Sequence, residues 1–115
     1  MKPIFIVSPK FMDVCSVVID AYAITLYPFI ISREEIDDKT KRHEMIHFEQ
    51  QKELFIVFFY LLYVYYYFIN YLKCKDKFLA YLTIPFEREA YVHQNSKNYL
   101  EKRQKFSWIN YLKWL

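Results

Sequence analysis

Residues 42–72 read RHEMIHFEQQKELFIVFFYLLYVYYYFINYL, and this stretch decides the fold. From about Thr40 the chain contains neither Pro nor Gly until Pro85, so a helix can continue without interruption. Its first part is polar and charged on most faces, whereas residues 54–69 carry no charge and no side-chain amide. The charged sequence KCKDK at residues 73–77 then indicates a turn. We therefore expect a helix from about Thr40 that runs on into the aromatic segment.

The polar part of this helix carries an H-E-x-x-H motif at His43, Glu44 and His47. Histidines at positions i and i+4 lie one turn apart on one helix face, so two imidazoles can bind one Zn²⁺. The adjacent Glu44 can then reach a water on the metal. Two of the chain's three histidines fall in the motif. A chance match on a solvated helix face is therefore the weaker interpretation, and the motif predicts Zn²⁺ as the cofactor.

A third zinc ligand is expected downstream, because a zinc ion that keeps one open position for water needs three protein ligands. The candidates are Glu87 and Glu89 in the sequence PFEREAY, residues 85–91. On a helix that begins at Pro85, Glu87 shares a face with Ala90, while Glu89 points about 200° away from Glu87. The small side chain of Ala90 would allow two helices to approach closely. Glu87 is therefore favoured as the ligand, and Glu89 stays open as the alternative.

An oxyanion formed during hydrolysis would need a further hydrogen-bond donor. Tyr91 and His93 are the choices near Glu87, and His93 lies six residues from Glu87, which turns it to another face. A structural role explains either side chain better than an oxyanion role. Tyr91 is kept as the candidate for an oxyanion donor or for a residue that supports a metal ligand.

These elements resemble the gluzincin branch of zinc metallopeptidases, in which a distal helix containing Glu-x-x-Ala follows the H-E-x-x-H helix. The chain is similar in particular to small uncharacterised bacterial and phage zincin-like proteins. The resemblance rests on a strand like Ala23–Leu26, the Arg-His-Glu-x-x-His-x-x-Gln helix at residues 42–50 and the Pro-Phe-Glu-Arg-Glu-Ala-Tyr helix at residues 85–91. It covers roughly residues 20–100 and implies a minimal zincin-like fold.

The resemblance also implies roles for single residues. His43, His47 and Glu87 would be the zinc ligands, and Glu44 would be the general base that takes a proton from a metal-activated water. Peptidases with a Glu-x-x-Ala-Asp element have an ionised partner where this chain has Tyr91. The implied function is a zinc-dependent hydrolase, in the first place a metallopeptidase acting on a peptide or protein substrate. The alternative is a catalytically inactive zinc-binding protein or a membrane-associated structural or interaction protein.

The N-terminal third predicts a small β-containing unit. Short apolar runs at residues 4–7, 14–19 and 23–31 are typical of strands, and Pro28 inside the last run places residues 23–27 at a sheet edge or a bulge. An edge strand at residues 23–27 could pair with an extended peptide, or it could be an ordinary edge.

The start of the active-site helix has two signals. Ser32 with Glu35 forms a possible capping box, and Asp37-Asp38 favours a helix N-terminus through the macrodipole. After the turn at residues 73–77, Pro85 is well placed as the first residue of a new helix that could continue to about Arg103.

A last amphipathic piece is expected at residues 106–115, with Trp108, Trp114 and Leu115 among its apolar residues. We thus expect one helix-dominated α+β domain over residues 1–115. Its parts are a β-containing unit at 1–36, the active-site helix and aromatic segment at 37–77, and the Glu-bearing and C-terminal helices at 78–115.

Composition narrows the function further. The 115 residues contain no Gly, which excludes phosphate-binding loops built on glycine, and the net charge of +3 comes from scattered residues, which argues against a nucleic-acid partner. Cys15 and Cys74 are too few for a disulfide framework, and the apolar part of the N-terminus is too short for a secretory signal. We expect a cytoplasmic protein, with a peripheral position at the membrane as a variant of that location.

The aromatic segment at residues 54–72 would span about 28 Å as a helix, close to the thickness of a bilayer core. A crossing helix would, however, separate His47 from Glu87, and residues 73–86 are too short to return. We therefore expect a non-spanning helix with a bend or break between about Val64 and Lys77. The tyrosine stripe of the segment, Tyr60, Tyr63, Tyr67 and Tyr71, marks a wet boundary. The segment is either a buried core helix or a contact to a membrane surface or an oligomer partner.

Overall fold

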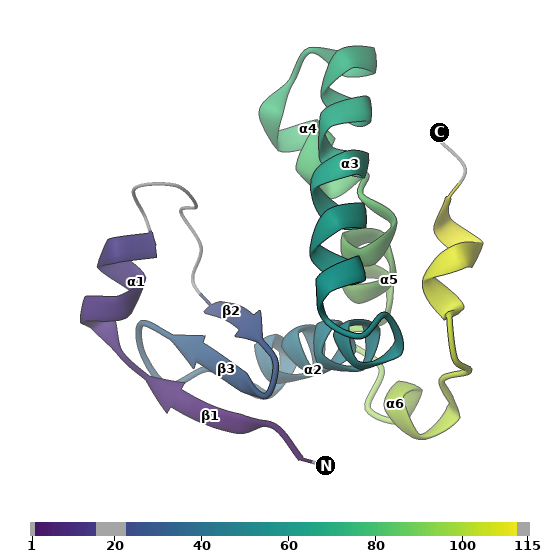
Figure 1. Cartoon of the computed structure of the whole chain (residues 1–115). Coiled ribbons are helices and arrows are strands. Elements are labelled where there is room, and N and C mark those ends of the chain that lie inside the picture. Colours follow the sequence, from purple (N-terminus) through teal and green to yellow (C-terminus); the bar gives the residue numbers. More distant parts are fainter. Residues whose placement is uncertain (1, 16–22, 113–115) are drawn as a thin grey trace.

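The computed structural model describes residues 2–15 and 23–112. Helices dominate, and a small three-stranded sheet lies at one end of the molecule, so the predicted helix-dominated α+β class is confirmed. Figure 1 shows α3 (Val57–Cys74) standing upright above α2 (Asp38–Glu53), with α4 (Lys77–Leu82) and α5 (Pro85–His93) beside it. The sheet packs along α2, since Thr25 bonds to Glu44 and the Tyr27 ring stacks on Phe48, and the hairpin of α3 and α4 projects away from the sheet.

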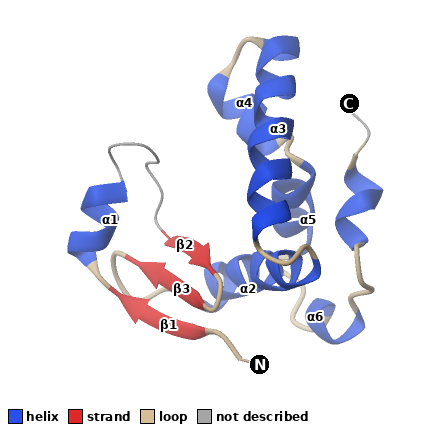
Figure 2. Ribbon diagram, in the orientation of Figure 1, coloured by secondary structure: helices blue, strands red, loops and turns tan. Residues whose placement is uncertain are grey.

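The sheet contains β1 (Ile4–Val7), β2 (Ala23–Leu26) and β3 (Phe29–Ser32) in the order β1-β3-β2 (Figure 2). β1 runs parallel to β3, and β2 runs antiparallel to it with Leu26 opposite Phe29. The single strand expected over 23–31 is therefore a hairpin, because a turn at residues 27–28 separates two strands. β2 is an edge strand, as the proline predicted.

The strand predicted at residues 14–19 is wrong for its first two residues. Val14 and Cys15 belong to α1 (Pro9–Cys15), and residues 16–19 lie outside the described part of the chain. Pro9 at the first position and the Ser8 hydroxyl, which accepts from the Phe11 N–H at 3.3 Å, start a helix that strand propensity did not reveal.

The helix that carries the H-E-x-x-H motif, α2 (Asp38–Glu53), begins at the acidic pair, as one of the two signals predicted. The Asp37 side chain accepts a hydrogen bond from the Thr40 N–H at 2.8 Å and caps the helix. The capping box proposed at Ser32 is wrong. Ser32 ends β3, and its hydroxyl donates to the Glu34 carbonyl at 2.6 Å.

An elbow at residues 54–56 separates α2 from α3 (Val57–Cys74), and the two helix axes differ by 113°. Phe55 and Ile56 both have positive φ, 53° and 66°, and the Val57 N–H bonds back to the Phe55 carbonyl at 2.6 Å in a γ-turn. The uninterrupted helix expected through this region is therefore wrong. The elbow turns Phe59 into the core, and the sequence has no Pro or Gly at residues 54–56 that would have indicated the elbow.

The break expected between Val64 and Lys77 is also present. Lys75 adopts a left-handed conformation with φ 58°, and its N–H bonds to the Tyr71 carbonyl at 2.8 Å. The chain then returns as α4 (Lys77–Leu82), which packs against α3. This hairpin brings the chain back to α2, against which α5 packs.

Pro85 is the first residue of α5 (Pro85–His93), as predicted, but the helix ends ten residues before Arg103. A short α6 (Tyr99–Lys102) and a 3₁₀ helix η1 (Ser107–Tyr111) follow. The chain turns after His93, and on its return Arg103 donates to Glu89 of α5 at 2.6 Å. Trp114 and Leu115 of the expected C-terminal piece lie outside the described residues.

The main core lies between α3, α5 and η1. It is built from Phe59, Ile84, Phe86 and Trp108, and partly buried tyrosines of α3 pack around it. The inner face of the aromatic segment is therefore core, as one interpretation predicted. Within the described residues no single helix is both long and apolar enough to cross a membrane; α2 and α3 meet those criteria only together, across their bend.

Candidate metal centre

Two histidines and a glutamate from two packed helices meet at one point. His43 and His47 lie one turn apart on α2, and Glu87 lies in the first turn of α5. The two Nε2 atoms are 3.2 Å apart, and Glu87 Oε1 lies 3.2 Å from His43 Nε2 and 3.1 Å from His47 Nε2. All three side chains are buried. The three atoms thus form a nearly equilateral triangle of potential ligands.

Both histidine rings are held from behind by glutamines. His43 Nδ1 lies 2.9 Å from Gln94 Oε1, and His47 Nδ1 lies 2.8 Å from Gln50 Oε1. The Gln50 amide is oriented by its own donor bonds, to the Phe86 carbonyl at 3.0 Å and to a Glu89 oxygen at 2.9 Å. Its oxygen therefore faces His47. With the proton on Nδ1, as the Gln50 oxygen favours for His47, each Nε2 lone pair points into the triangle.

Three lone pairs that face one another at this distance need a positive charge between them. In the metal-free protein, burial would lower the pKa of His47, but the Glu87 carboxylate outweighs burial and raises that pKa to about 9. Burial likewise opposes the charged form of Glu87, and the two histidines nevertheless hold its pKa well below the ordinary range. A proton can fill the triangle in this way, and so can a metal ion that all three atoms bind.

Glu44 lies beside the triangle and not in it. One of its oxygens accepts from the Thr25 hydroxyl at 2.8 Å, and the other lies 3.9 Å from His43 Nε2. Burial raises the pKa of this carboxyl above its ordinary value, against the histidines and Thr25, which lower it. His43, Glu44 and His47 have ligand atoms within 4.8 Å of one another, so this buried group could hold a metal ion.

Tyr63 of α3 fixes the second oxygen of Glu87. Its hydroxyl donates to Oε2 at 2.7 Å, and burial next to that carboxylate raises the pKa of Tyr63 far above its ordinary value. The tyrosine therefore stays neutral and a donor. Oε1 alone remains for the triangle, so Glu87 presents one oxygen to the histidines.

A pocket of about 200 Å³ opens over the triangle. Its lining includes the three triangle residues, Glu44, the β2 residues Ala23 to Thr25, and tyrosines of α3 and α4. The side chain of Gln51 ties β2 to α2, since it donates to the Thr25 carbonyl at 2.7 Å and accepts from the Tyr27 N–H at 2.9 Å. The edge strand is thereby held next to the candidate ligands.

The other predicted site residues fall in different places. Tyr91 packs its ring edge against His43 with centroids 4.5 Å apart, and its hydroxyl lies 2.8 Å from that of Tyr81, which lines the pocket. His93 faces elsewhere, as expected, and stacks on Tyr99.

Glu89 is not a ligand candidate. It is fully buried, and its oxygens accept from Arg103 at 2.6 and 3.1 Å and from the Tyr99 hydroxyl at 2.6 Å. The alternative of Glu89 as the third ligand is therefore not supported, because the chain after α5 covers this glutamate and occupies both of its oxygens.

Sequence reasoning missed the residues that orient the site: Gln50, Gln94, Tyr63 and Thr25. Two of them were within reach, since Gln50 follows His47 by three residues and Gln94 follows Glu87 by seven, spacings that share a helix face. Tyr63 stood in the tyrosine stripe, but only the elbow turns it toward Glu87. Thr25 gave no signal.

Comparison with known proteins adds no relative: no protein-family model, no curated protein and no solved structure matches this chain. The candidate metal site is therefore inferred from its geometry alone: a buried group of two histidines and neighbouring carboxylates that could hold a metal ion.

Proposed function

We propose that this chain is a zinc-dependent hydrolase with a minimal zincin-like fold, and that it cleaves peptide bonds. The observation that carries the proposal is the triangle of His43 Nε2, His47 Nε2 and Glu87 Oε1, with all three sides between 3.1 and 3.2 Å. Ligand atoms of a tetrahedral zinc ion with bonds of 2.0–2.1 Å are about 3.3 Å apart. The triangle therefore fits one face of a zinc tetrahedron.

Two carboxylates compete for the place of third ligand, and the distances favour Glu87. Glu87 Oε1 is close to both Nε2 atoms, whereas Glu44 Oε2 is 3.9 Å from the nearer one. Glu87 is also held by Tyr63 so that one oxygen points at the histidines. We assign His43, His47 and Glu87 as the ligands and leave Glu44 free for chemistry.

Glu44 is proposed as the general base. Zinc, when bound, supplies a Lewis acid that polarises a carbonyl and lowers the pKa of water toward about 7. Thr25 holds one Glu44 oxygen, and the other faces the pocket beside His43. The raised pKa of this buried carboxyl suits a group that accepts a proton and later returns it.

A peptide is the proposed substrate because the edge strand β2 lines the pocket. An extended chain could add to this edge by backbone hydrogen bonds. Gln51 and the Tyr60 hydroxyl already bind the Thr25 carbonyl, at 2.7 and 3.0 Å. A substrate strand would therefore pair with the part of β2 nearer Ala23. Tyr81 and its partner Tyr91 place hydroxyls near the pocket that could donate to an oxyanion.

The test compares metal content and turnover in matched variants. Glu44→Gln should retain one zinc per chain and lose peptidase activity on an unstructured peptide mixture, while Glu49→Gln on the same helix should keep both. His43→Ala should lose the zinc. Zinc that survives His43→Ala would refute the site, and equal turnover in Glu44→Gln would refute the mechanism. Zinc binding without turnover in the wild-type protein would instead support the catalytically inactive alternative.

A further inference from the structure

α3 has a second apolar face that nothing within the described chain covers. Its members are large side chains with exposed fractions of 49–65%: Val57, Phe58, Leu61, Val64, Tyr65, Phe68 and Leu72. At about 100° per residue they occupy one arc of about 120° along the whole helix. The buried residues Phe59 and Asn70 lie on the opposite side. We call these seven residues the outer face.

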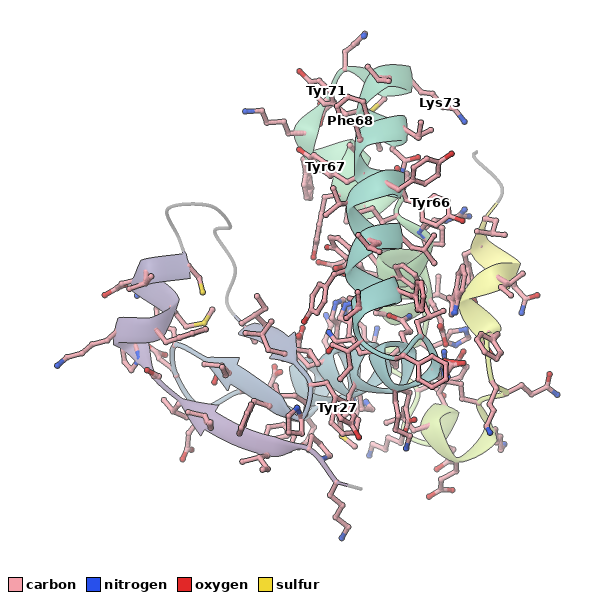
Figure 3. All side chains as sticks on the ribbon, in the orientation of Figure 1. Tyr27, Tyr66, Tyr67, Phe68, Tyr71 and Lys73 are labelled. Atoms are coloured by element: carbon pink, nitrogen blue, oxygen red, sulfur yellow. The ribbon has the colours of Figure 1, made fainter. Side chains whose placement is uncertain are left out.

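Figure 3 shows the side chains that border the outer face on its two sides. Phe68 lies between Tyr67 and Tyr71 on one side of α3 and Tyr66 and Lys73 on the other. Tyrosines have an apolar ring and a polar tip, so they suit a border between an apolar medium and water. The outer face itself carries no charged side chain.

The outer face is large for a monomer. With about 150–250 Å² for each aromatic side chain, the exposed fractions of Phe58, Tyr65 and Phe68 alone correspond to on the order of 350 Å², and four exposed aliphatic side chains enlarge the same patch. The largest apolar patch of a typical monomer is about 300–600 Å², and larger ones mark interaction sites. The face therefore needs an occupant, either lipid or protein.

Lysines are concentrated at one end of the outer face. Lys73 and Lys75 lie where α3 turns into α4, and Lys77 begins α4; Asp76 is the carboxylate among them, so this end has a net positive charge. At the elbow, Lys52 lies 3.4 Å from Glu49, and both line a hollow with Glu53 and Lys105, so charges of both signs meet there. An apolar face with one cationic end is complementary to an apolar layer under anionic headgroups.

The cationic end argues against a parallel pair of two copies of this chain as the occupant. In such a pair the Lys75 and Lys77 ends would meet, which places positive charge against positive charge. An anionic bilayer surface has no such conflict, and an antiparallel pair of copies is an outcome that the test below distinguishes.

We propose that the outer face of α3 binds the surface of an anionic phospholipid bilayer, with the helix axis in the plane of the membrane. The apolar side chains enter the boundary between headgroups and acyl chains, and the lysines where α3 turns into α4 reach phosphate and carboxylate groups. Binding of this kind does not require a crossing helix, in keeping with the absence of one among the described residues.

The position of the pocket gives this surface a consequence for the substrate. Val64 belongs to the outer face and also lines the pocket, and Tyr60 and Tyr63 continue the lining toward the triangle. A bilayer on the outer face would lie beside the pocket opening. The substrate class would then be polypeptide segments at the membrane surface; this step rests on the proposed function, whereas lipid binding does not.

Co-sedimentation with vesicles tests the proposal. The full chain should bind vesicles with about one-third phosphatidylserine, bind phosphatidylcholine vesicles at least tenfold more weakly, and dissociate as salt rises. Leu61→Glu combined with Phe68→Glu should weaken binding at least tenfold. Val14→Glu, a matched change at a 71% exposed position on α1, should bind as the wild type does. Replacing Lys73, Lys75 and Lys77 with Gln should reduce binding to anionic vesicles by about fivefold per lysine.

Zinc content and turnover of a soluble peptide are measured on each variant, and unchanged values show that the fold is retained. Because vesicle binding is measured independently of both, a failure of the membrane proposal can be told from a failure of the proposed function. Two results would overturn the inference. One is a wild-type protein that ignores anionic vesicles at low salt. The other is a dimer in sedimentation equilibrium that Leu61→Glu dissociates while vesicle binding is absent, which would assign the face to a second copy.

Discussion

Gln50 connects the metal centre to the core, and its removal should disturb both. It is fully buried, accepts the Nδ1 proton of His47, and donates to the Phe86 carbonyl and to Glu89. In Gln50→Ala the His47 proton is buried without a partner, and Glu89 loses one of its donors. A buried group without a partner costs about 1–3 kcal/mol. We expect the free energy of unfolding of the zinc-free protein to fall by about 3 kcal/mol.

The same substitution should weaken zinc binding, because His47 loses the contact that fixes its ring orientation. Loss of such a supporting contact lowers metal affinity by about 10–100-fold. Urea denaturation of the zinc-free protein measures the first effect, and competition with a chromophoric chelator measures the second.

Gln94→Ala is the matched comparison. Gln94 is half-buried, and its amide oxygen contacts the Nδ1 atom of His43 at 2.9 Å, so its loss should cost less than about 1 kcal/mol of stability. Its zinc affinity should nevertheless fall as far as that of Gln50→Ala. If both variants keep wild-type zinc affinity, the glutamines do not orient ligands, and the argument from the paired Nδ1 contacts fails.

Three further results are expected. Tyr63→Phe removes the donor to Glu87 Oε2 and should lower zinc affinity about tenfold, with a change of about 1 kcal/mol in unfolding free energy; an unchanged chelator titration would contradict the geometry. Zinc affinity should rise about tenfold per pH unit between neutral pH and about 9. The reason is that the pKa of His47 in the metal-free protein is about 9, and His47 must lose this proton to bind the metal. A zinc affinity that calorimetry finds to be independent of pH would contradict this. Arg103→Met leaves two buried carboxylates unpaired and should cost about 3–5 kcal/mol in urea denaturation. Burial alone would raise the pKa of Glu89, but its bonds to Arg103, Tyr99 and Gln50 lower it below the ordinary glutamate value. The ion pair therefore stabilises the fold fully above the ordinary glutamate pKa, and this stabilisation is lost as the pH falls through the lowered pKa of the folded protein. The acid sensitivity of unfolding should therefore be smaller in Arg103→Met than in the wild type.

Local spacing explains what the sequence could predict. The i, i+4 pair of histidines, the helix start at the acidic pair Asp37-Asp38 and the helix start at Pro85 are each set by a few neighbouring residues, and all three are present as expected. The preference for Glu87 over Glu89 came from the same helical geometry. A straight helix would have carried the chain away from the metal ligands, so a break followed by a return was expected. The left-handed Lys75 provides this break.

The elbow and the orienting side chains depend on contacts between distant parts of the chain. Nothing in Leu54 to Ile56 resembles a helix stop, and the bend exists because Phe59 packs with Phe86 and Trp108. The tyrosine stripe was predicted to mark a wet boundary, but its first members face the pocket: Tyr60 binds the Thr25 carbonyl and Tyr63 binds the buried Glu87. Such roles appear only when the tertiary structure is known.

The backbone of this protein holds unused capacity for stabilisation. Among the described residues, four that carry a Cβ adopt positive φ, at Phe55, Ile56, Lys75 and Phe106, and the sequence offers no glycine for any of them. A left-handed conformation costs an ordinary residue about 1–2 kcal/mol, while total stability is about 5–15 kcal/mol. We therefore expect Lys75→Gly and Phe106→Gly to be the first substitutions to try for a higher free energy of unfolding. We would leave the γ-turn at Ile56 alone, because that turn aims Tyr63 at Glu87.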